Sequence, residues 1–142
     1  MWTTTTRLGL ALVSLIAVSA MPGVRPAVAE LRFMSKGLSG GQSAGYDFET
    51  KNQAVVIVTV SGRAWSDGTF RSSVEISIDL NGKLCAQDQS FVPVNWAVEH
   101  KVSATCAEHV GPGKYWVKAY IGGEGIKGES RKLSGKVIVI EP

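Results

Sequence analysis

The chain has 142 residues, of which 44% are hydrophobic and 19% are charged, and its formal net charge is +3. Two of its 15 basic residues, Arg7 and Arg25, lie in the first 29 residues, so 13 basic residues face 12 acidic ones in the rest of the chain. This length is typical of one domain with a single core, and the balanced charge gives no electrostatic case for nucleic acid or an anionic membrane as the partner.

The N-terminus has the features of a secretory signal peptide. Arg7 precedes an apolar run from Leu8 to Ala20, and the small-residue pattern Ala27-Val28-Ala29 follows. The run is shorter than the roughly 20 residues that a membrane-spanning helix needs. We therefore predict that residues 1–29 are cleaved and that the protein is secreted or periplasmic, without stable membrane insertion. Retention of the segment as a signal anchor is the alternative.

Residues 30–45 are rich in glycine and serine and predict a loose N-terminal arm. From residue 46 to residue 142 the dominant pattern is alternation of apolar and polar side chains, which is typical of strands with one buried face. Val74, Ile76, Ile78 and Leu80, for example, alternate with polar residues. We expect about seven strands, near residues 46–49, 54–65, 70–80, 83–91, 95–106, 114–121 and 133–140.

The segment "RAWSDGTF" places Asp67-Gly68 between Trp65 and Phe70. A two-residue turn at Asp67-Gly68 would pair the two aromatic side chains across a hairpin. If the two strands kept this register further from the turn, Val56, Val58 and Val60 of the preceding strand would face outward. We therefore predict a β-bulge near Ser61-Gly62, and we interpret Trp65 first as a residue that stabilises the turn and second as a ligand contact.

A second turn signal, Asn81-Gly82, predicts a tight hairpin, because both positions of its turn need positive φ. The two-residue loop would pair Leu80 with Lys83 and Ile78 with Cys85. Cys85 would then lie on the core face.

Cys85 and Cys106 are the two cysteines of the chain, and in an exported protein they predict one disulfide bond. The alternative is a metal-handling protein, since His109 follows Cys106 at a ligand-like spacing and His100 shares the predicted face of Cys106. We expect the disulfide and no cofactor.

No catalytic constellation is apparent, and we expect a protein that is not an enzyme. Serine, histidine and acidic residues all occur, but no set of acid, base and nucleophile converges by spacing. His100 alternates with core residues, which favours a structural role. The segment "GEGIKG" around Glu124 matches a dinucleotide-binding fingerprint in letters only, because no helix is expected after it. We interpret residues 122–128 as a loop at one end of the domain, where recognition often occurs.

The segment "KYWVKAYI" predicts a strand that presents aromatic side chains outward. Tyr115 begins the core-facing set of the strand, and its hydroxyl is expected to bond back to the preceding connection, as in a tyrosine corner. Trp116, Lys118 and Tyr120 would lie on the opposite face. Aromatic side chains in that position can stack on sugars or anchor a protein partner.

These patterns together predict an all-β protein, a single antiparallel β-sandwich that resembles the immunoglobulin-like sandwiches in architecture. Our main hypothesis is an exported, non-catalytic module that binds a protein or a glycan. The candidate binding residues are Trp116, Lys118 and Tyr120 on one face and Trp65, Asp67 and Glu124 at one end. The alternative is a structural or assembly component of the cell envelope that accepts a partner's strand at a sheet edge.

Overall fold

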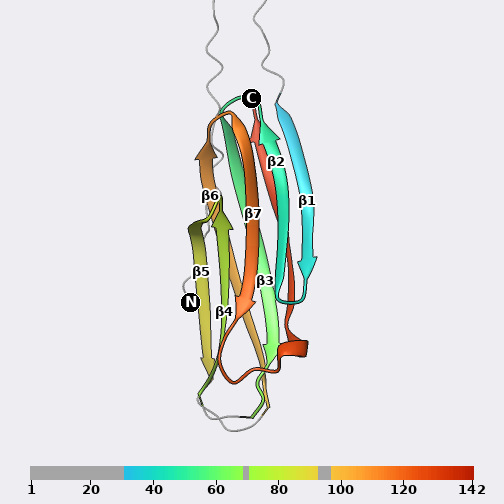
Figure 1. Cartoon of the computed structure of the whole chain (residues 1–142), viewed down its shortest axis with the longest axis vertical. Helices are drawn as coiled ribbons and strands as arrows, with labels where there is room; N and C mark the ends of the chain where they lie inside the picture. The colour runs from blue at the N-terminus through green and yellow to red at the C-terminus, as the bar shows by residue number, and fades with distance from the viewer. Residues whose placement is uncertain (1–30, 69–70, 93–96) are drawn as a thin grey trace, which may run out of the picture.

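The computed structural model describes residues 31–68, 71–92 and 97–142, so the predicted signal peptide lies outside the described residues. Strands dominate this part of the chain (Figure 1). The strands are β1 (Arg32–Gly40), β2 (Ser43–Thr50), β3 (Ala54–Trp65), β4 (Ser72–Leu80), β5 (Lys83–Val92), β6 (Glu99–Val110), β7 (Gly113–Gly122) and β8 (Lys132–Glu141), and a short 3₁₀ helix, η1, spans Gly128–Ser130.

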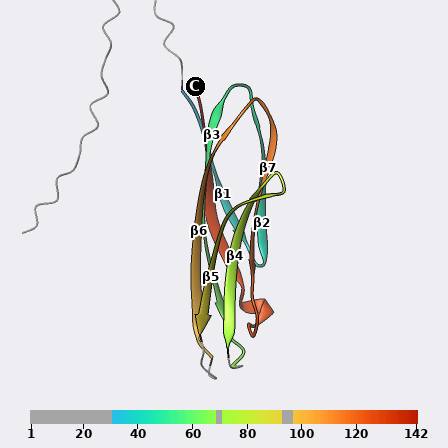
Figure 2. The same cartoon turned by 90° about the vertical axis from the view of Figure 1, so that its left-hand side faces the viewer.

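The strands form two four-stranded antiparallel sheets, which Figure 2 shows as two layers. Sheet A has the order β1-β8-β3-β6, and sheet B has the order β2-β7-β4-β5. This order is that of an eight-stranded jelly roll. The predicted antiparallel sandwich is therefore confirmed, with a jelly-roll connectivity in place of an immunoglobulin one. Apart from β4 and β5, strands that follow each other in sequence lie in different sheets.

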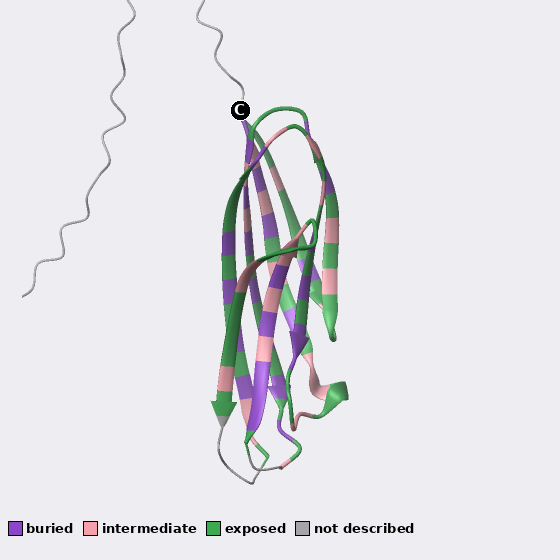
Figure 3. Ribbon diagram, turned by 60° about the vertical axis from the view of Figure 1, so that its left-hand side comes forward, coloured by how far each residue is buried: buried purple, intermediate pink, exposed green. Residues whose placement is uncertain are grey.

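The core lies between the sheets and is built by the alternation seen in the sequence, which Figure 3 shows as colour changes along the strands. Inward positions of β3 and β4 are inaccessible to solvent, and the polar residues between them lie outward. The buried side chains of these two strands include Val56, Val58, Val60, Val74, Ile76 and Ile78.

The prediction of a loose arm at residues 30–45 is wrong for most of that range. Residues 32–40 form β1, which pairs with β8 along its whole length, and residue 43 already begins β2. The glycines and serines suggested a flexible segment, but the alternating positions Met34 and Leu38 pack into the core. A strand whose outward face is polar needs only a few apolar side chains to be held in place.

The expected hairpin between Trp65 and Phe70 is wrong, because β3 and β4 belong to different sheets. Trp65 lies opposite Glu99 of β6, and Phe70 lies outside the described residues. The predicted bulge at Ser61-Gly62 is wrong as well, since β3 pairs regularly through these residues with both β6 and β8. Without a β3–β4 hairpin, all inward positions of β3 reach the core in one regular register.

The hairpin at Asn81-Gly82 is confirmed, with positive φ at both residues and Leu80 opposite Lys83. The partner of Ile78 is Ala86 and not Cys85, because the register shifts between Ile78 and Asp79. Cys85 is the extra residue of this bulge. It forms the predicted disulfide with Cys106 of β6, with 5.7 Å between the two Cα atoms. The bond joins the two sheets along one edge of the sandwich.

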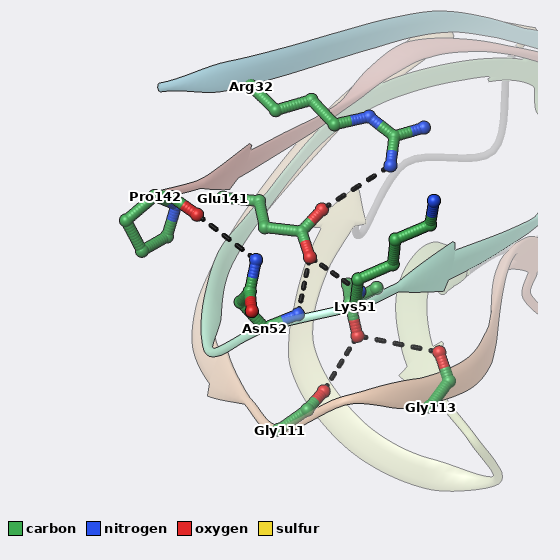
Figure 4. Close-up of polar contacts among 8 residues, drawn as sticks. Arg32, Lys51, Asn52, Gly111, Gly113, Glu141 and Pro142 are labelled. Carbon is green, nitrogen blue, oxygen red and sulfur yellow. Dashed lines mark hydrogen bonds and ion pairs between the residues drawn. The ribbon is translucent and has the colours of Figure 1, made fainter. Parts of the chain in front are cut away.

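Polar side chains close the end of the sandwich where the chain terminates (Figure 4). The buried carboxylate of Glu141 accepts hydrogen bonds from the backbone N–H groups of Lys51 and Asn52 in the β2–β3 turn, and it pairs with Arg32 at 3.6 Å. The hydroxyl of Tyr115 donates to the carbonyl of Gly111 at 3.0 Å, as expected for a tyrosine corner. The hydrogen bond of Tyr115 fixes the start of β7, the strand that carries the candidate binding residues.

Candidate functional site

The outer face of sheet B presents the three side chains expected from the sequence. Trp116, Lys118 and Tyr120 alternate along β7, which lies between β2 and β4. Trp116 is 40% exposed and Tyr120 is 41% exposed. No described segment covers this pair.

The backbone of Trp116 is held by the β4–β5 turn. Its N–H donates to the side-chain oxygen of Asn81 at 2.8 Å, and its carbonyl accepts from the N–H of Asn81 at 3.0 Å. The indole lies over Gly82, where an added Cβ would stand 3.6 Å from its Cζ2 atom. The turn therefore supports one edge of the indole, and the side chain stays partly exposed to solvent.

Two shallow depressions flank Trp116 on this face. One has a volume of about 590 Å³ and lies over Ser43, Gly45 and Lys118, and the other, of about 500 Å³, lies over Glu49. Asp47 lies directly opposite Trp116 in the β2–β7 ladder and lines both depressions. We call Gly45, Asp47, Trp116, Lys118 and Tyr120 the Trp116 site.

Tyr120 is oriented at the other end of this site. Gln42 donates a hydrogen bond of 2.7 Å to the Tyr120 hydroxyl. The Tyr120 ring leans over Gly122, where a Cβ would come within 2.7 Å of the ring atom Cε1. A side chain at Gly122 would displace the ring, so the glycine keeps Tyr120 in this position.

The other three candidate residues lie away from the Trp116 site. Trp65 is 46% exposed, but it belongs to β3 and therefore to sheet A. Asp67 and Glu124 lie where the β3–β4 connection meets the β7–β8 loop. The N–H of Asp67 donates to Gly125 at 2.9 Å, and the carbonyl of Glu124 accepts from Ser73 at 3.0 Å. The structure therefore does not bring the six candidates into one site.

The residues of the metal-handling alternative do not converge. Cys106 is in the disulfide, and His109 is exposed on the opposite side of β6. His100 is buried and its Nε2 atom lies 3.0 Å from the hydroxyl of Ser72. Burial lowers the pKa of His100, because the charged form would lose its hydration. Across the described parts of the chain, no group of three His, Cys, Asp or Glu residues could hold a metal ion.

The sequence did not point to Gly45 or Asp47 as site residues. Both lie in β2, at positions that become neighbours of β7 only through the pairing of the two strands. Alternation predicts which side of a strand faces out, but it does not predict which strand lies next to it. Only the pairing of β2 with β7 shows that Gly45 lies beside Lys118 and Asp47 beside Trp116.

No family model and no curated protein sequence matches the chain. Some solved structures show a distant similarity. The CBM36-1 domain of a multidomain xylanase from the hindgut metagenome of Trinervitermes trinervoides is similar at a TM-score of 0.31 and 10% identity, over 75% of this chain and 76% of that one. A structure described as "EclA C-terminal domain; sugar-binding protein" is similar at a TM-score of 0.34 and 12% identity, over 88% of this chain and 90% of that one.

Within residues 31–68, 71–92 and 97–142, no helix is long and apolar enough to cross a bilayer.

Proposed function

We propose that this protein is an exported, non-catalytic module that binds a neutral glycan at the Trp116 site. The observation that carries the proposal is the exposed, backbone-supported indole of Trp116 between two open depressions, with Asp47 beside it. An indole face offers an apolar platform for the C–H face of a sugar ring. The carboxylate of Asp47 and the ammonium of Lys118 supply an acceptor and a donor for sugar hydroxyls.

The composition of this face favours a glycan over a protein partner. Its two large aromatic side chains are separated by Lys118 and surrounded by the carboxylates of Asp47, Glu49 and Asp79. The buried centre of a protein interface is depleted of charged residues and needs a larger apolar patch. Sugars tolerate a mixture of aromatic and charged contacts, because their hydroxyls hydrogen-bond to the charged groups.

Titration with soluble neutral oligosaccharides, followed by calorimetry, tests this proposal. Trp116→Ala is expected to weaken binding by about 30-fold, the loss of roughly 2 kcal/mol that marks a dominant aromatic contact. Trp65→Ala is the matched control, since it removes a tryptophan of similar exposure from the other sheet. Equal losses in both variants, or no binding of any neutral glycan by the parent protein, would contradict the proposal.

The second candidate function is an assembly component of the envelope. The edge strand β5 supports it, because Leu84 and Phe91 on this strand are exposed. A partner strand could pair with such an edge. Sedimentation over a range of protein concentrations distinguishes the two functions: self-association that Phe91→Ser abolishes would favour assembly, and a monomer at all concentrations would favour the glycan-binding module.

A further inference from the structure

A depression of about 760 Å³ lies on the outer face of sheet A, the layer opposite the Trp116 site. Side chains of β1, β3, β6 and β8 line it, together with Arg131 just before β8 and Asp88 of the neighbouring β5. The basic and serine residues of the four sheet A strands are dispersed in the sequence, and the sheet places them in two parallel rows.

The first row is cationic. Arg63 of β3 lies opposite Lys132 of β8 on one side and opposite Lys101 of β6 on the other. All three side chains are exposed on the outer face. Neighbouring strands are about 4.8 Å apart, so the three positive charges cross most of the sheet in one line.

The second row consists of serine hydroxyls. It lies two residues further along each strand, about 7 Å from the first row. Ser39 pairs with Ser134, Ser134 with Ser61, and Ser61 with Ser103, so the row crosses all four strands. The hydroxyls of Ser61 and Ser134 are 3.4 Å apart. A serine hydroxyl can donate one hydrogen bond and accept others, so the row offers donors along its whole length.

Arg131 adds a fourth basic side chain to the depression. Its Nε atom is buried and has no hydrogen-bond partner among the described residues. We call Arg63, Lys101, Arg131, Lys132 and the four serines the cationic groove.

Carboxylates neutralise only part of this charge. Glu99 pairs with Arg63 at 3.6 Å and with Lys101 at 3.3 Å. Asp88 reaches the rim and accepts a hydrogen bond of 3.3 Å from the backbone N–H of Ser103. Four cationic side chains therefore face two carboxylates, which leaves an excess of two positive charges.

We infer that the cationic groove is a second binding site, for a polysaccharide whose sugars carry oxyanion substituents, carboxylate or sulfate. Arginine and lysine would bind the oxyanions, with the planar guanidinium groups suited to two-pronged contacts, and the serine row would bind the sugar hydroxyls. This inference does not depend on the proposed function, because it uses other residues on the opposite sheet.

Two observations favour a charged polysaccharide over an isolated phosphate ion or a nucleic acid. The groove is elongated, with a hydroxyl row that crosses four strands, and the exposed ring of Trp65 lies one row beyond the cationic residues. An extended sugar chain can use cations, hydroxyls and an aromatic platform together. A nucleic acid carries a dense row of phosphates, and its binding depends on neutralising many of them, for which an excess of two charges is small.

Affinity electrophoresis of the full chain in gels that contain polygalacturonate, dextran sulfate or neutral dextran tests the inference. We expect retardation by polygalacturonate, by dextran sulfate or by both, and none by dextran. The gel that retards the protein identifies carboxylate or sulfate as the substituent. Retardation should fall when 1 M salt shortens the screening length to about 3 Å.

Paired variants separate the groove from general charge effects. Arg63→Gln combined with Lys132→Gln should weaken binding at least tenfold, and Lys83→Gln combined with Lys114→Gln, which removes the same charge from sheet B, should leave it unchanged. If the protein with both Arg63→Gln and Lys132→Gln fails to fold, Lys132→Gln alone replaces it in the test, because Lys132 is exposed and its substitution leaves the core intact. Equal losses in the two pairs, no retardation by either anionic polymer, or equally tight binding of a single-stranded oligonucleotide would overturn the inference.

Discussion

His100 is a titratable side chain in a position where the fold disfavours its charge. It is 1% exposed, its Nε2 atom lies near the hydroxyl of Ser72, and its Nδ1 atom has no hydrogen-bond partner among the described residues. Burial lowers the pKa of the imidazole below its ordinary value of 6.5. The folded protein therefore holds His100 in its neutral form at neutral pH.

This position predicts that the protein loses stability in mildly acidic solution. As the pH falls through about 6.5, the unfolded chain takes up a proton that the folded chain does not, so unfolding becomes more favourable until the lower folded pKa is reached. Urea unfolding at pH 7.5 and pH 5.5 measures the change. His100→Gln should flatten this dependence, and the exposed His109→Gln should retain it. An unchanged pH dependence in His100→Gln would show that another group is responsible.

Gly62 is a second residue whose role becomes clear from its packing. A Cβ at this position would stand 2.6 Å from the Cδ1 atom of Ile121 and 3.3 Å from that of Ile76. Both isoleucines are fully buried side chains of the opposite sheet. The glycine at this position allows β3 to approach sheet B closely, and it does not mark a bulge.

Gly62→Ala should therefore destabilise the protein. Overpacking costs about 1 to 3 kcal/mol, and the lower entropy of the unfolded chain returns only about 0.4 to 1 kcal/mol. Gly37→Ala is the matched control, because a Cβ there meets nothing within 4 Å. The free energy of unfolding should fall by about 1 kcal/mol or more for Gly62→Ala, given those two magnitudes, and stay constant or rise for Gly37→Ala. The opposite order would contradict this account of the packing.

At the scale of the element, the bulge in the β4–β5 hairpin is the feature that allows the disulfide. The register shift lets Cys85 and Ala86 follow each other on the inward side of β5. Cys85 thereby reaches Cys106 at the adjacent edge of sheet A. The bond spans 21 positions of the chain and holds together two edges that share no backbone ladder.

Replacing both cysteines by alanine should lower the free energy of unfolding by about 3 kcal/mol, the entropy cost of a loop of this length. Denaturant unfolding of the parent and the double variant measures the difference. Two reactive thiols in the unfolded, unreduced parent protein, or equal stabilities of the two proteins, would contradict the role of this bond.

Turn signals in the sequence predicted the local backbone conformation better than they predicted which strands pair. Gly68 has positive φ, as the Asp67-Gly68 signal requires, yet the chain passes there from sheet A to sheet B. At Asn81-Gly82 a similar signal joins two strands of one sheet. The residues of a turn determine its dihedral angles, whereas the wider packing determines which sheet the chain enters next. In a jelly roll most connections change sheet, so the hairpin inferred at Asp67-Gly68 failed.

At the scale of the whole molecule, the two outer faces differ in charge. The outer face of sheet B carries four carboxylates against two lysines, Lys114 and Lys118, and the outer face of sheet A carries four basic side chains against one carboxylate, Glu99. The acidic set is Asp47, Glu49, Glu75 and Asp79, and the basic set is Arg63, Lys101, Lys132 and Lys136. The near-balance of total charge conceals this separation.

The alternation of side chains thus predicted the sandwich, the inward set of β6 and the outward set of β7. It did not predict the cationic groove or the place of Asp47 beside Trp116. Arg63, Lys101 and Lys132 occupy ordinary outward positions of three separate strands, and they become a row only through the order β8-β3-β6. Sites that depend on the order of strands in a sheet require the long-range pairing, which single-sequence patterns do not contain.

The central claim is that a neutral glycan binds on the outer face of sheet B. Nuclear magnetic resonance of the ¹⁵N-labelled protein, titrated with neutral oligosaccharides, tests it most directly, because each tryptophan indole gives its own N–H signal. We predict that the indole signal of Trp116, assigned with Trp116→Phe, and the backbone amides of β2 and β7 shift with saturation, while the indole of Trp65 does not move. Shifts confined to sheet A, or no saturable shift at Trp116, would contradict the claim.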